Sequence, residues 1–216
     1  MAPRSLANRL QKRVLKALFG FNKARRYQHL ERIVHEIQPR RLMEIGCFRG
    51  ENGRRMIDAA LAHHPASEIE FFGFDLFEWL DEEKLEAEVS KRPPPLAEVR
   101  ARLEGSGAKI RLVQGDTTET LPRLRAELPR MDLVFIDGGH SLATIASDWQ
   151  NVEPLLHERS VVILDDYWET AEAGAKTLVD ALDRNRYAVR LLDPIDRFLT
   201  AEGHVFTTRF AEVRPK

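Results

Sequence analysis

Residues 131–167 read MDLVFIDGGHSLATIASDWQNVEPLLHERSVVILDDY, and this stretch predicts the fold. Two short apolar runs of β type stop at carboxylates, the first at Asp137 and the second at Asp165 and Asp166. Between them, residues 141–158 suffice for one helix and its turns, which is the spacing of a parallel strand–helix–strand unit. Because parallel neighbours end at the same edge of a sheet, the three carboxylates are expected to converge there. Converging carboxylates repel one another, so the stretch predicts a divalent cation among them.

The composition is typical of one soluble globular domain. The chain has 216 residues, of which 43% are hydrophobic and 31% charged. A formal net charge of -1 argues against a nucleic-acid partner bound through bulk positive charge. The single cysteine, Cys47, excludes an intramolecular disulfide and a thiolate zinc cluster. No apolar run is long enough to span a bilayer and no secretory signal is recognisable, so we expect a cytoplasmic protein.

The N-terminal segment differs from the rest in charge. Eight basic residues precede the first acid, Glu31, and leucines and valine recur every four residues from Leu6 to Leu18. This pattern predicts a basic amphipathic helix that breaks near Gly20, within an extension over residues 1–38. Packing on the domain or on a second copy of the chain is favoured, with a peripheral membrane contact or a substrate lid as alternatives. Residues 39–216 are expected to form the main domain.

Strands and helices alternate through the main domain. After a helix over residues 26–37, strands are expected at residues 41–45, 68–76, 109–114 and 131–136, and the fifth is the run that stops at Asp165. One helix is expected to follow the first strand and its glycine turn and to end near residue 63. Two helical halves are expected over residues 78–103, around three prolines, and further helices at 120–128 and 170–184. Runs over 187–192 and 204–210 are joined by a loop through Pro194 and pair antiparallel, since no helix fits between them. The pattern predicts an α/β doubly wound sheet.

A glycine turn and two further acids follow the first three strands. Gly46 and Gly50 lie between a strand and a helix, where glycine lets the backbone bend and approach a ligand. Asp75 ends the second strand, where it could accept hydrogen bonds from ribose hydroxyls, and Asp116 ends the third, where it could accept an adenine amine. The turn lacks the G-x-G-x-x-G spacing of pyrophosphate binders. A nucleoside held without a phosphate cradle fits S-adenosylmethionine better than a dinucleotide.

Five motifs resemble those of the class I S-adenosylmethionine-dependent methyltransferases. They are Glu44-x-Gly46-x-x-x-Gly50, Gly73-Phe74-Asp75-Leu76-Phe77, Gly115-Asp116, the run Phe135 to Ser141, and the run Val162 to Tyr167. The last two resemble the metal-dependent small-molecule branch, which includes the macrocin and novobiocin-type sugar O-methyltransferases. The resemblance covers about residues 40–210.

The resemblance implies a seven-stranded sheet of order 3-2-1-4-5-7-6 with its last strand antiparallel. It also implies Mg²⁺, or another divalent cation, at Asp137, Asp165 and Asp166. The residues expected to contact the methyl donor are Glu44, Gly46, Cys47, Gly50, Asp75, Leu76, Asp116, Thr117 and Asp137.

Methyl transfer to a hydroxyl needs alignment of donor and acceptor and a more nucleophilic oxygen. A cation chelated by a vicinal diol of a sugar, glycoside or phenol would provide both. Either Asp137 or His140 is expected to take the proton; an ordinary histidine pKa near ~6.5 suits a base. The alternative is that His140 caps the following helix or hydrogen-bonds Tyr167.

The remaining chemistry-bearing residues have simpler interpretations. Cys47 is expected to be a small turn residue, Trp149 a core residue, and His63 with His64 a surface helix end. Tyr167 and Trp168 are candidates for lining an acceptor pocket. Two other functions stay open: a nicotinamide-dependent oxidoreductase, and a non-catalytic S-adenosylmethionine-binding or scaffold protein.

Overall fold

A mostly parallel sheet forms the centre of the protein. The computed structural model describes residues 24–87, 92–168, 174–199 and 205–216. Among these residues the sheet runs in the order β3-β2-β1-β4-β5-β8-β6, and β7 pairs with β8. The strands are β1 (Arg41–Ile45), β2 (Glu70–Asp75), β3 (Lys109–Gln114), β4 (Leu133–Ile136), β5 (Val161–Trp168), β6 (Tyr187–Leu191), β7 (Asp196–Leu199) and β8 (Val205–Pro215).

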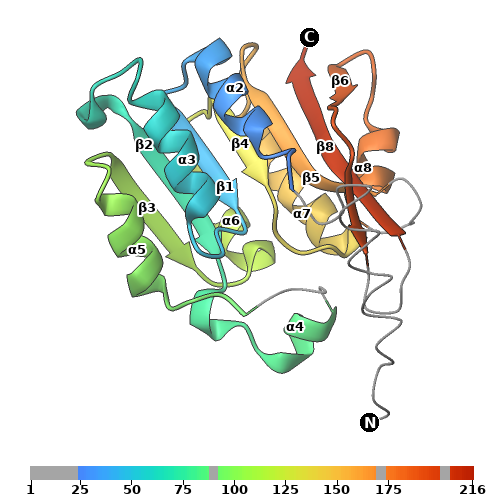
Figure 1. The fold of residues 1–216 in the computed structure, drawn as a ribbon, viewed down its shortest axis with the longest axis horizontal. Helices are drawn as coiled ribbons and strands as arrows, with labels where there is room; N and C mark the ends of the chain where they lie inside the picture. Colours follow the sequence, from blue (N-terminus) through green and yellow to red (C-terminus); the bar gives the residue numbers. More distant parts are fainter. Residues whose placement is uncertain (1–23, 88–91, 169–173, 200–204) are drawn as a thin grey trace, which may run out of the picture.

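Helices cover both faces of the sheet (Figure 1). One face carries α2 (Gln28–Ile37), α3 (Glu51–Ala60) and α5 (Leu96–Glu104), and the other carries α6 (Thr117–Leu124), α7 (Leu142–Val152) and α8 (Lys176–Ala181). A short helix, α4 (Glu82–Ala87), follows β2. Single 3₁₀ turns lie at Ala66–Glu68, Phe77–Trp79, Arg125–Glu127 and Glu153–Leu155.

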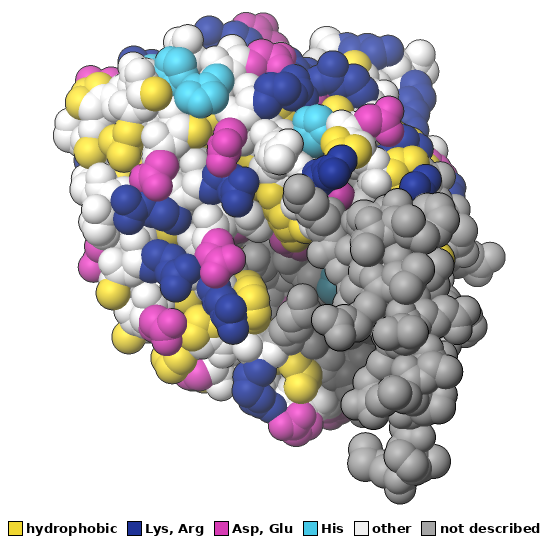
Figure 2. Space-filling view, viewed as in Figure 1, with side chains coloured by type: hydrophobic (Ala, Val, Ile, Leu, Met, Phe, Trp, Pro, Cys, Tyr) yellow, Lys and Arg dark blue, Asp and Glu magenta, His cyan; other side chains and the backbone are white. Residues whose placement is uncertain are grey.

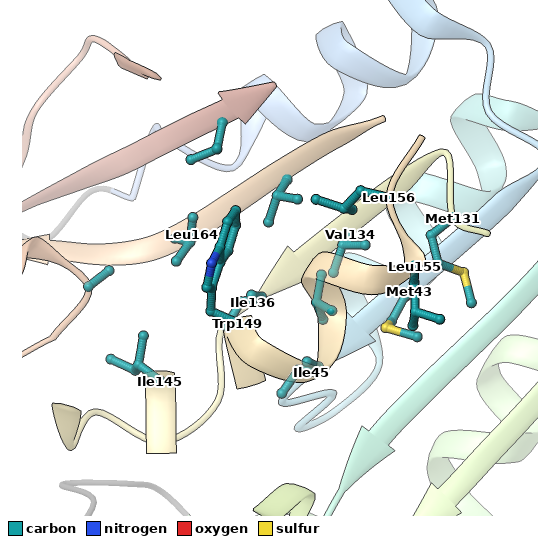
Figure 3. Close-up of a cluster of buried hydrophobic side chains, with 14 of the residues drawn as sticks. Met43, Ile45, Met131, Val134, Ile136, Ile145, Trp149, Leu155, Leu156 and Leu164 are labelled. Carbon is teal, nitrogen blue, oxygen red and sulfur yellow. The ribbon is translucent and has the colours of Figure 1, made fainter. Parts of the chain in front are cut away.

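Two hydrophobic cores sit on opposite faces because successive strand residues point to opposite sides. Met43, Val134 and Leu164 pack with the side chains of α6, α7 and α8, among which Trp149 is a central member (Figure 3). Their neighbours in the same strands, such as Leu42, pack instead against α2, α3 and α5. Strands buried on both faces read as continuous apolar runs, which is why the sequence predicted the parallel core.

The predicted order holds, but the strand count was wrong. The structure has eight strands among the described residues, because β7 forms within the stretch predicted as a loop through Pro194. β7 is a four-residue strand that exists by antiparallel pairing with β8, from Asp196 opposite Thr208 to Leu199 opposite Val205. The antiparallel pairing predicted for residues 187–192 and 204–210 is confirmed as β6 with β8.

The fifth strand also ends later than predicted. β5 continues through Asp165 and Asp166 to Trp168, whereas the sequence predicted that it stops at the carboxylates. The predicted basic helix near the N-terminus lies outside the described residues, and so do residues 170–173 of the last predicted helix.

The visible surface mixes charges of both signs. Figure 2 shows basic and acidic side chains interspersed over the face of α2 and α3, where pairs such as Arg54 with Asp58 and Arg55 with Glu31 form. In the part of the chain that the structure describes, no helix is both long and apolar enough to cross a membrane.

Asp132 links the beginnings of β1 and β4, and its removal tests this link. One oxygen accepts the backbone N–H groups of Arg40 and Arg41 at 2.8 and 2.9 Å, and the other lies 3.0 Å from His157 Nε2. Burial would raise the pKa of Asp132, but these N–H groups hold it below its ordinary value. We expect Asp132→Ala to lower the free energy of unfolding by about 1–3 kcal/mol at pH 7, because two N–H groups lose a charged acceptor.

The same substitution has a predicted pH dependence. A lowered carboxylate pKa contributes stability that is present above the unfolded-state pKa, near about 3.9, and is lost as the pH falls toward the folded-state pKa. Urea unfolding should therefore show the full difference at pH 6–7 and a smaller one below about pH 4. The exposed Asp58→Ala serves as control and should cost no more than about 0.5 kcal/mol. Equal losses in the two variants would contradict the role of Asp132.

Candidate functional site

Three carboxylates meet at the carboxyl edge of β4 and β5. Asp137, Asp165 and Asp166 each offer an oxygen within 4.8 Å of the others, which confirms the predicted convergence. Consecutive residues of a regular strand point to opposite faces, so Asp165 and Asp166 could not both face Asp137 without a distortion. β5 supplies it as a bulge: Leu164 pairs with Ala211 and Tyr167 with Arg209, and Asp166 has a φ of 55°.

Asp165 is fully surrounded by donors. Its Oδ1 accepts Arg26 Nε at 2.6 Å and the backbone N–H of Asp166 at 2.6 Å. Its Oδ2 accepts Arg26 Nη2 at 2.8 Å and the Tyr27 hydroxyl at 3.1 Å. The side chains of Asp165 and Arg26 are 0% and 7% exposed, so this ion pair is shielded from water.

Asp166 is paired with His140. His140 Nε2 lies 2.6 Å from Asp166 Oδ2, and the Trp168 indole N–H donates to Asp166 Oδ1 at 3.1 Å. The imidazole stacks on the indole with ring centroids 5.4 Å apart. The alternative roles proposed for His140 were wrong, because Ser141 is the residue that caps α7 and the Tyr167 hydroxyl donates to Asp180.

The pKa shifts report an incompletely compensated negative charge. Burial, and then the charges of Asp165 and Asp166, raise the pKa of Asp137 well above its ordinary value. Burial and the Asp166 charge raise the pKa of Asp165 to about 6 even though Arg26 opposes them. Burial would also raise the pKa of Asp166, but the hydrogen bond with His140 and the charge of that ring lower it. The protein holds the first two carboxyls in a setting where a further cation would be stabilised.

The glycine turn lies directly against Asp137. Gly46 has a φ of +86°, and a Cβ placed on it would lie 2.0 Å from the Asp137 carbonyl oxygen. The backbone N–H of Asp137 donates to the Ile45 carbonyl at 2.8 Å, and that of Gly46 donates to Phe74 at 2.8 Å. Gly50, with a φ of +71°, precedes α3 and faces Val99. The turn and the acidic loop therefore share a backbone contact that only glycine permits.

Asp75 organises the end of β2. Its Oδ2 accepts the backbone N–H of Phe48 at 2.7 Å, and its Oδ1 accepts that of Phe77 at 2.8 Å. Burial raises its pKa, and these backbone bonds oppose that rise. Leu76 lies next to it, half-buried, with its carbonyl accepting Gln114 Nε2 at 3.4 Å. Asp75 thus ties the glycine turn to the following loop.

Two residues predicted to contact the methyl donor, Glu44 and Cys47, are buried beside the glycine turn. Glu44 is 1% exposed and its Oε2 has no hydrogen-bond partner within the described part of the chain. Burial and then the Asp75 charge raise its pKa well above the ordinary value. Cys47 is buried, and burial and the Glu44 charge raise the pKa of its thiol. The interpretation of Cys47 as a small turn residue fits this placement, since a Cβ on Gly73 would come 2.7 Å from its sulfur.

Asp116 occupies the next strand end and caps a helix. Its Oδ1 accepts the backbone N–H of Thr118 at 2.9 Å, next to Thr117 at the beginning of α6. Its Oδ2 is paired with the ammonium of Lys84 from α4. Burial is the largest single influence and would raise the pKa of Asp116, but the hydrogen bonds from Lys84 and Thr118 together outweigh it and lower the pKa.

A small pocket opens beside the carboxylates. Its lining comprises Ile136, Asp137, Gly138, Gly139, His140, Ile145, Leu164, Asp165, Asp166 and Ala175. Trp149 belongs to the core, as predicted. Tyr167, predicted as a pocket residue, is also buried in that core, because the bulge turns its side chain toward α8. Trp168 lies at the site through its contacts with His140 and Asp166.

The sequence did not predict four residues around the site: the cations Arg26 and Lys84, the hydroxyl of Tyr27, and Asp196, whose carboxylate anchors Arg26. Arg26 and Tyr27 come from the chain just before α2, Lys84 from α4 and Asp196 from β7. Arg26 lies in a basic stretch whose other members look the same in sequence. The only local signal is the tyrosine beside it, ahead of the buried stripe of α2.

Comparisons with known proteins agree on the family and fold. A family profile described as "Methyltransferase domain" matches residues 43–167. Among proteins with curated descriptions, none matches the chain in sequence. Three solved structures of methyltransferases share the fold of this chain at sequence identities of 15–18%, which are too low to show more than the fold. They are the O-methyltransferase TomG from Streptomyces achromogenes, involved in tomaymycin synthesis and solved with S-adenosylmethionine (16% identity, 100% of this chain and 92% of that one, TM-score 0.59), an O-methyltransferase from Bacillus cereus solved with S-adenosylhomocysteine (15%, 99% and 93%, 0.58), and the calicheamicin methyltransferase CalS11 (18%, 99% and 94%, 0.60).

The contact between Gly46 and Asp137 gives a matched pair of variants. Gly46→Ala places a Cβ on a backbone oxygen, whereas at Gly107, with a φ of +78°, the nearest atom is 3.5 Å away. Both variants incur about 1–2 kcal/mol for an alanine in left-handed conformation. Only Gly46→Ala adds the clash. We therefore expect urea unfolding to show that Gly46→Ala lowers the free energy of unfolding by about 3 kcal/mol or more, and Gly107→Ala by about half of that. Similar losses would show that the turn does not press on the acidic loop.

Proposed function

The chain belongs to the methyltransferase family whose domain profile matches residues 43–167, and on that premise we propose an O-methyltransferase that uses S-adenosylmethionine. The methyl acceptor is a hydroxyl of a small molecule, and a divalent cation, Mg²⁺ first among them, is held at the carboxylate cluster. The observation that carries the proposal is the position of Asp137. Its carbonyl touches the glycine turn, and its carboxylate belongs to the acidic trio.

The donor side fits a nucleoside. Asp75 accepts the backbone N–H groups of Phe48 and Phe77, which fixes the two loops around it. Its carboxylate lies at the end of β2 beside the glycine turn, where we propose that it accepts hydrogen bonds from the ribose hydroxyls. Gly46, which has no side chain, lies at the edge of the sheet beside the switch in strand order between β1 and β4, where ligands of doubly wound folds bind. When bound, S-adenosylmethionine supplies an electrophilic methyl group on a sulfonium.

The cation side fits a hard divalent ion. Asp137, Asp165 and Asp166 offer only oxygen donors, and burial together with mutual repulsion raises the pKa of the first two. Mg²⁺ prefers oxygen ligands and binds through one or two carboxylates with several waters. When bound, such a cation lowers the pKa of an acceptor hydroxyl and fixes its position. A vicinal diol of a sugar, glycoside or phenol has the chelating geometry that this role requires.

The chain's own residues orient the acceptor and take its proton. His140 lines the pocket, where its ring contacts Asp166 and stacks on Trp168. These contacts leave the ring few orientations, as positioning a general base requires. Asp137 is the second candidate for the proton, because its carboxylate belongs to the trio and lines the same pocket. The carboxylate trio and the buried Arg26 set the electrostatic field in which the hydroxyl loses its proton.

A ligand-binding experiment tests the proposed function. We expect S-adenosylhomocysteine, but not NAD, to raise the melting temperature of the wild-type protein, and labelled methyl donor to be consumed with a catechol or sugar diol only when Mg²⁺ is present. Asp137→Ala should abolish cation-dependent turnover while changing the affinity for S-adenosylhomocysteine by less than about threefold. The exposed Asp58→Ala is the control and should match wild type in both. Absence of any shift with S-adenosylhomocysteine would overturn the methyltransferase assignment, and full activity in a chelator would overturn the cation alone.

His140 is tested separately by kinetics. We expect His140→Gln, which keeps a donor toward Asp166, to lower kcat by about 10²-fold or more with little change in KM, the range for loss of a general base. Trp168→Phe removes the indole N–H but keeps an aromatic ring, and its kcat should fall less than tenfold. A kcat for His140→Gln within threefold of wild type would assign the proton to Asp137.

A further inference from the structure

We propose that Arg26 is a positioning residue of the cation site. It holds Asp165 by both oxygens, neutralises one of the three carboxylates, and leaves Asp137 and Asp166 as the two that contact the cation. This inference rests on the proposed function for the presence of a cation. It adds a residue outside the acidic motifs and gives the three carboxylates different tasks.

The contact between Arg26 and Asp165 is a two-pronged ion pair. Nε and Nη2 lie 2.6 and 2.8 Å from the two carboxylate oxygens, the fork geometry that guanidinium and carboxylate groups share. The pair joins residues 139 positions apart, and both side chains are buried. A lysine could supply the charge here but not the fork.

Counting acceptor positions shows what the pair does to Asp165. A carboxylate has about four lone-pair positions. Arg26 fills two, the Tyr27 hydroxyl a third, and the backbone N–H of Asp166 the fourth. With all four occupied, Asp165 has none left for a cation, so it acts through its ion pair and not as a direct ligand.

The charges of the trio then match a divalent ion. Counted over the trio and Arg26, three carboxylates and one guanidinium leave two negative charges, which reside on Asp137 and Asp166. A fourth carboxylate, that of Asp196, also contacts Arg26 and is stabilised separately by the backbone N–H groups of Arg25 and Arg26. Two carboxylates with waters and an acceptor diol are a sufficient ligand set for Mg²⁺. Asp166 Oδ1 accepts the Trp168 N–H and, at 3.5 Å, the Thr208 hydroxyl, whereas Oδ2 contacts His140 alone among the described residues, so Asp166 keeps an acceptor position on Oδ2.

Arg26 is itself anchored from the far end of the chain. Its Nη1 lies 3.1 Å from Asp196 of β7, and Asp196 also accepts the backbone N–H groups of Arg25 and Arg26. The guanidinium carbon lies 4.6 Å from the Tyr27 ring centroid and 5.7 Å from that of Phe210. These contacts fix the guanidinium before any cation arrives, as a positioning role requires.

A double-mutant cycle on the metal alone tests the assignment. Mn²⁺ binding is measured by titration calorimetry, without donor or acceptor, for wild type, Arg26→Met, Asp165→Asn and the double variant. We expect Arg26→Met to bind Mn²⁺ about tenfold more tightly, because an unshielded third carboxylate is released toward the ion. A purely structural role would leave the Mn²⁺ affinity unchanged. Arg26→Lys should return the affinity to within about threefold of wild type, since it restores the charge.

The double variant decides between an anchored and a coordinating Asp165. Arg26→Met with Asp165→Asn removes one positive and one negative charge, so the trio together with position 26 keeps its net charge, and no buried arginine is left unpaired. We expect its Mn²⁺ affinity to lie within about threefold of wild type. Asp166→Asn should weaken binding at least thirtyfold. A thirtyfold loss in the double variant would make Asp165 a direct ligand and overturn the inference.

Two further measurements, circular dichroism melts and S-adenosylhomocysteine binding, distinguish a misfolded variant and a failed proposed function from a failed inference. Circular dichroism melts accompany every variant, and if either single variant does not fold, the charge-neutral double variant still gives the deciding comparison. Arg55→Met, an exposed arginine paired with Glu31, is the control for loss of an arginine and should leave Mn²⁺ affinity unchanged. If wild type binds no Mn²⁺ while S-adenosylhomocysteine still binds, the inference fails and the donor half of the proposed function stands. If Mn²⁺ binding follows the predicted cycle but S-adenosylhomocysteine does not bind, the inference about Arg26 stands and the donor half of the proposed function fails.

Discussion

The repulsion among Asp137, Asp165 and Asp166 is the interaction on which the rest of the site depends. Their oxygens lie within 4.8 Å of one another at a sheet edge where Asp165 is buried and Asp137 and Asp166 are partly buried, so like charges interact more strongly than in bulk water. Four neighbouring polar side chains donate to two of these carboxylates and so reduce the repulsion. Arg26 and Tyr27 address Asp165, and His140 and Trp168 address Asp166. The raised pKa of Asp137 marks the charge that the protein leaves for a ligand to compensate.

The bulge in β5 is what converts an ordinary strand into this arrangement. In a regular strand Asp165 and Asp166 would be separated by the sheet, one on each face, and the strand would offer a single acid to Asp137. The extra residue opposite Phe210 and the left-handed backbone at Asp166 turn both to one side. Gly174 supports this strained backbone closely, since a Cβ there would lie 2.4 Å from the Asp166 carbonyl. A local distortion is thus held in place because the packing around it allows no alternative.

The sequence predicted the positions of the acids well and their local roles poorly. Apolar runs that stop at carboxylates locate strand ends, so Asp75, Asp116 and the trio lie on one sheet edge as expected. What each acid contacts depends on tertiary packing. Asp116 caps α6 and pairs with Lys84, and Asp75 ties two loops together.

The failures have physical causes that local patterns do not carry. Nothing in the run of basic residues distinguishes Arg26, whose burial arises from a carboxylate 139 positions away. β7 is four residues long and exists by pairing with β8, so its stretch reads as a loop. The bulge was missed because a strand that passes through two aspartates looks, in sequence, like one that stops at them.

The compensating groups come largely from outside the segment that defines the family. The profile covers residues 43–167, which contain the glycine turn, Asp75, Asp116 and all three carboxylates of the trio. Arg26 precedes this segment and Asp196 follows it, and the two meet across 170 positions. The segment that the profile covers therefore carries the three carboxylates, and the flanking segments supply the guanidinium that pairs with one of them and the carboxylate that anchors this guanidinium. A relative that kept the acids but changed either flank would keep the fold and alter the charge of the site.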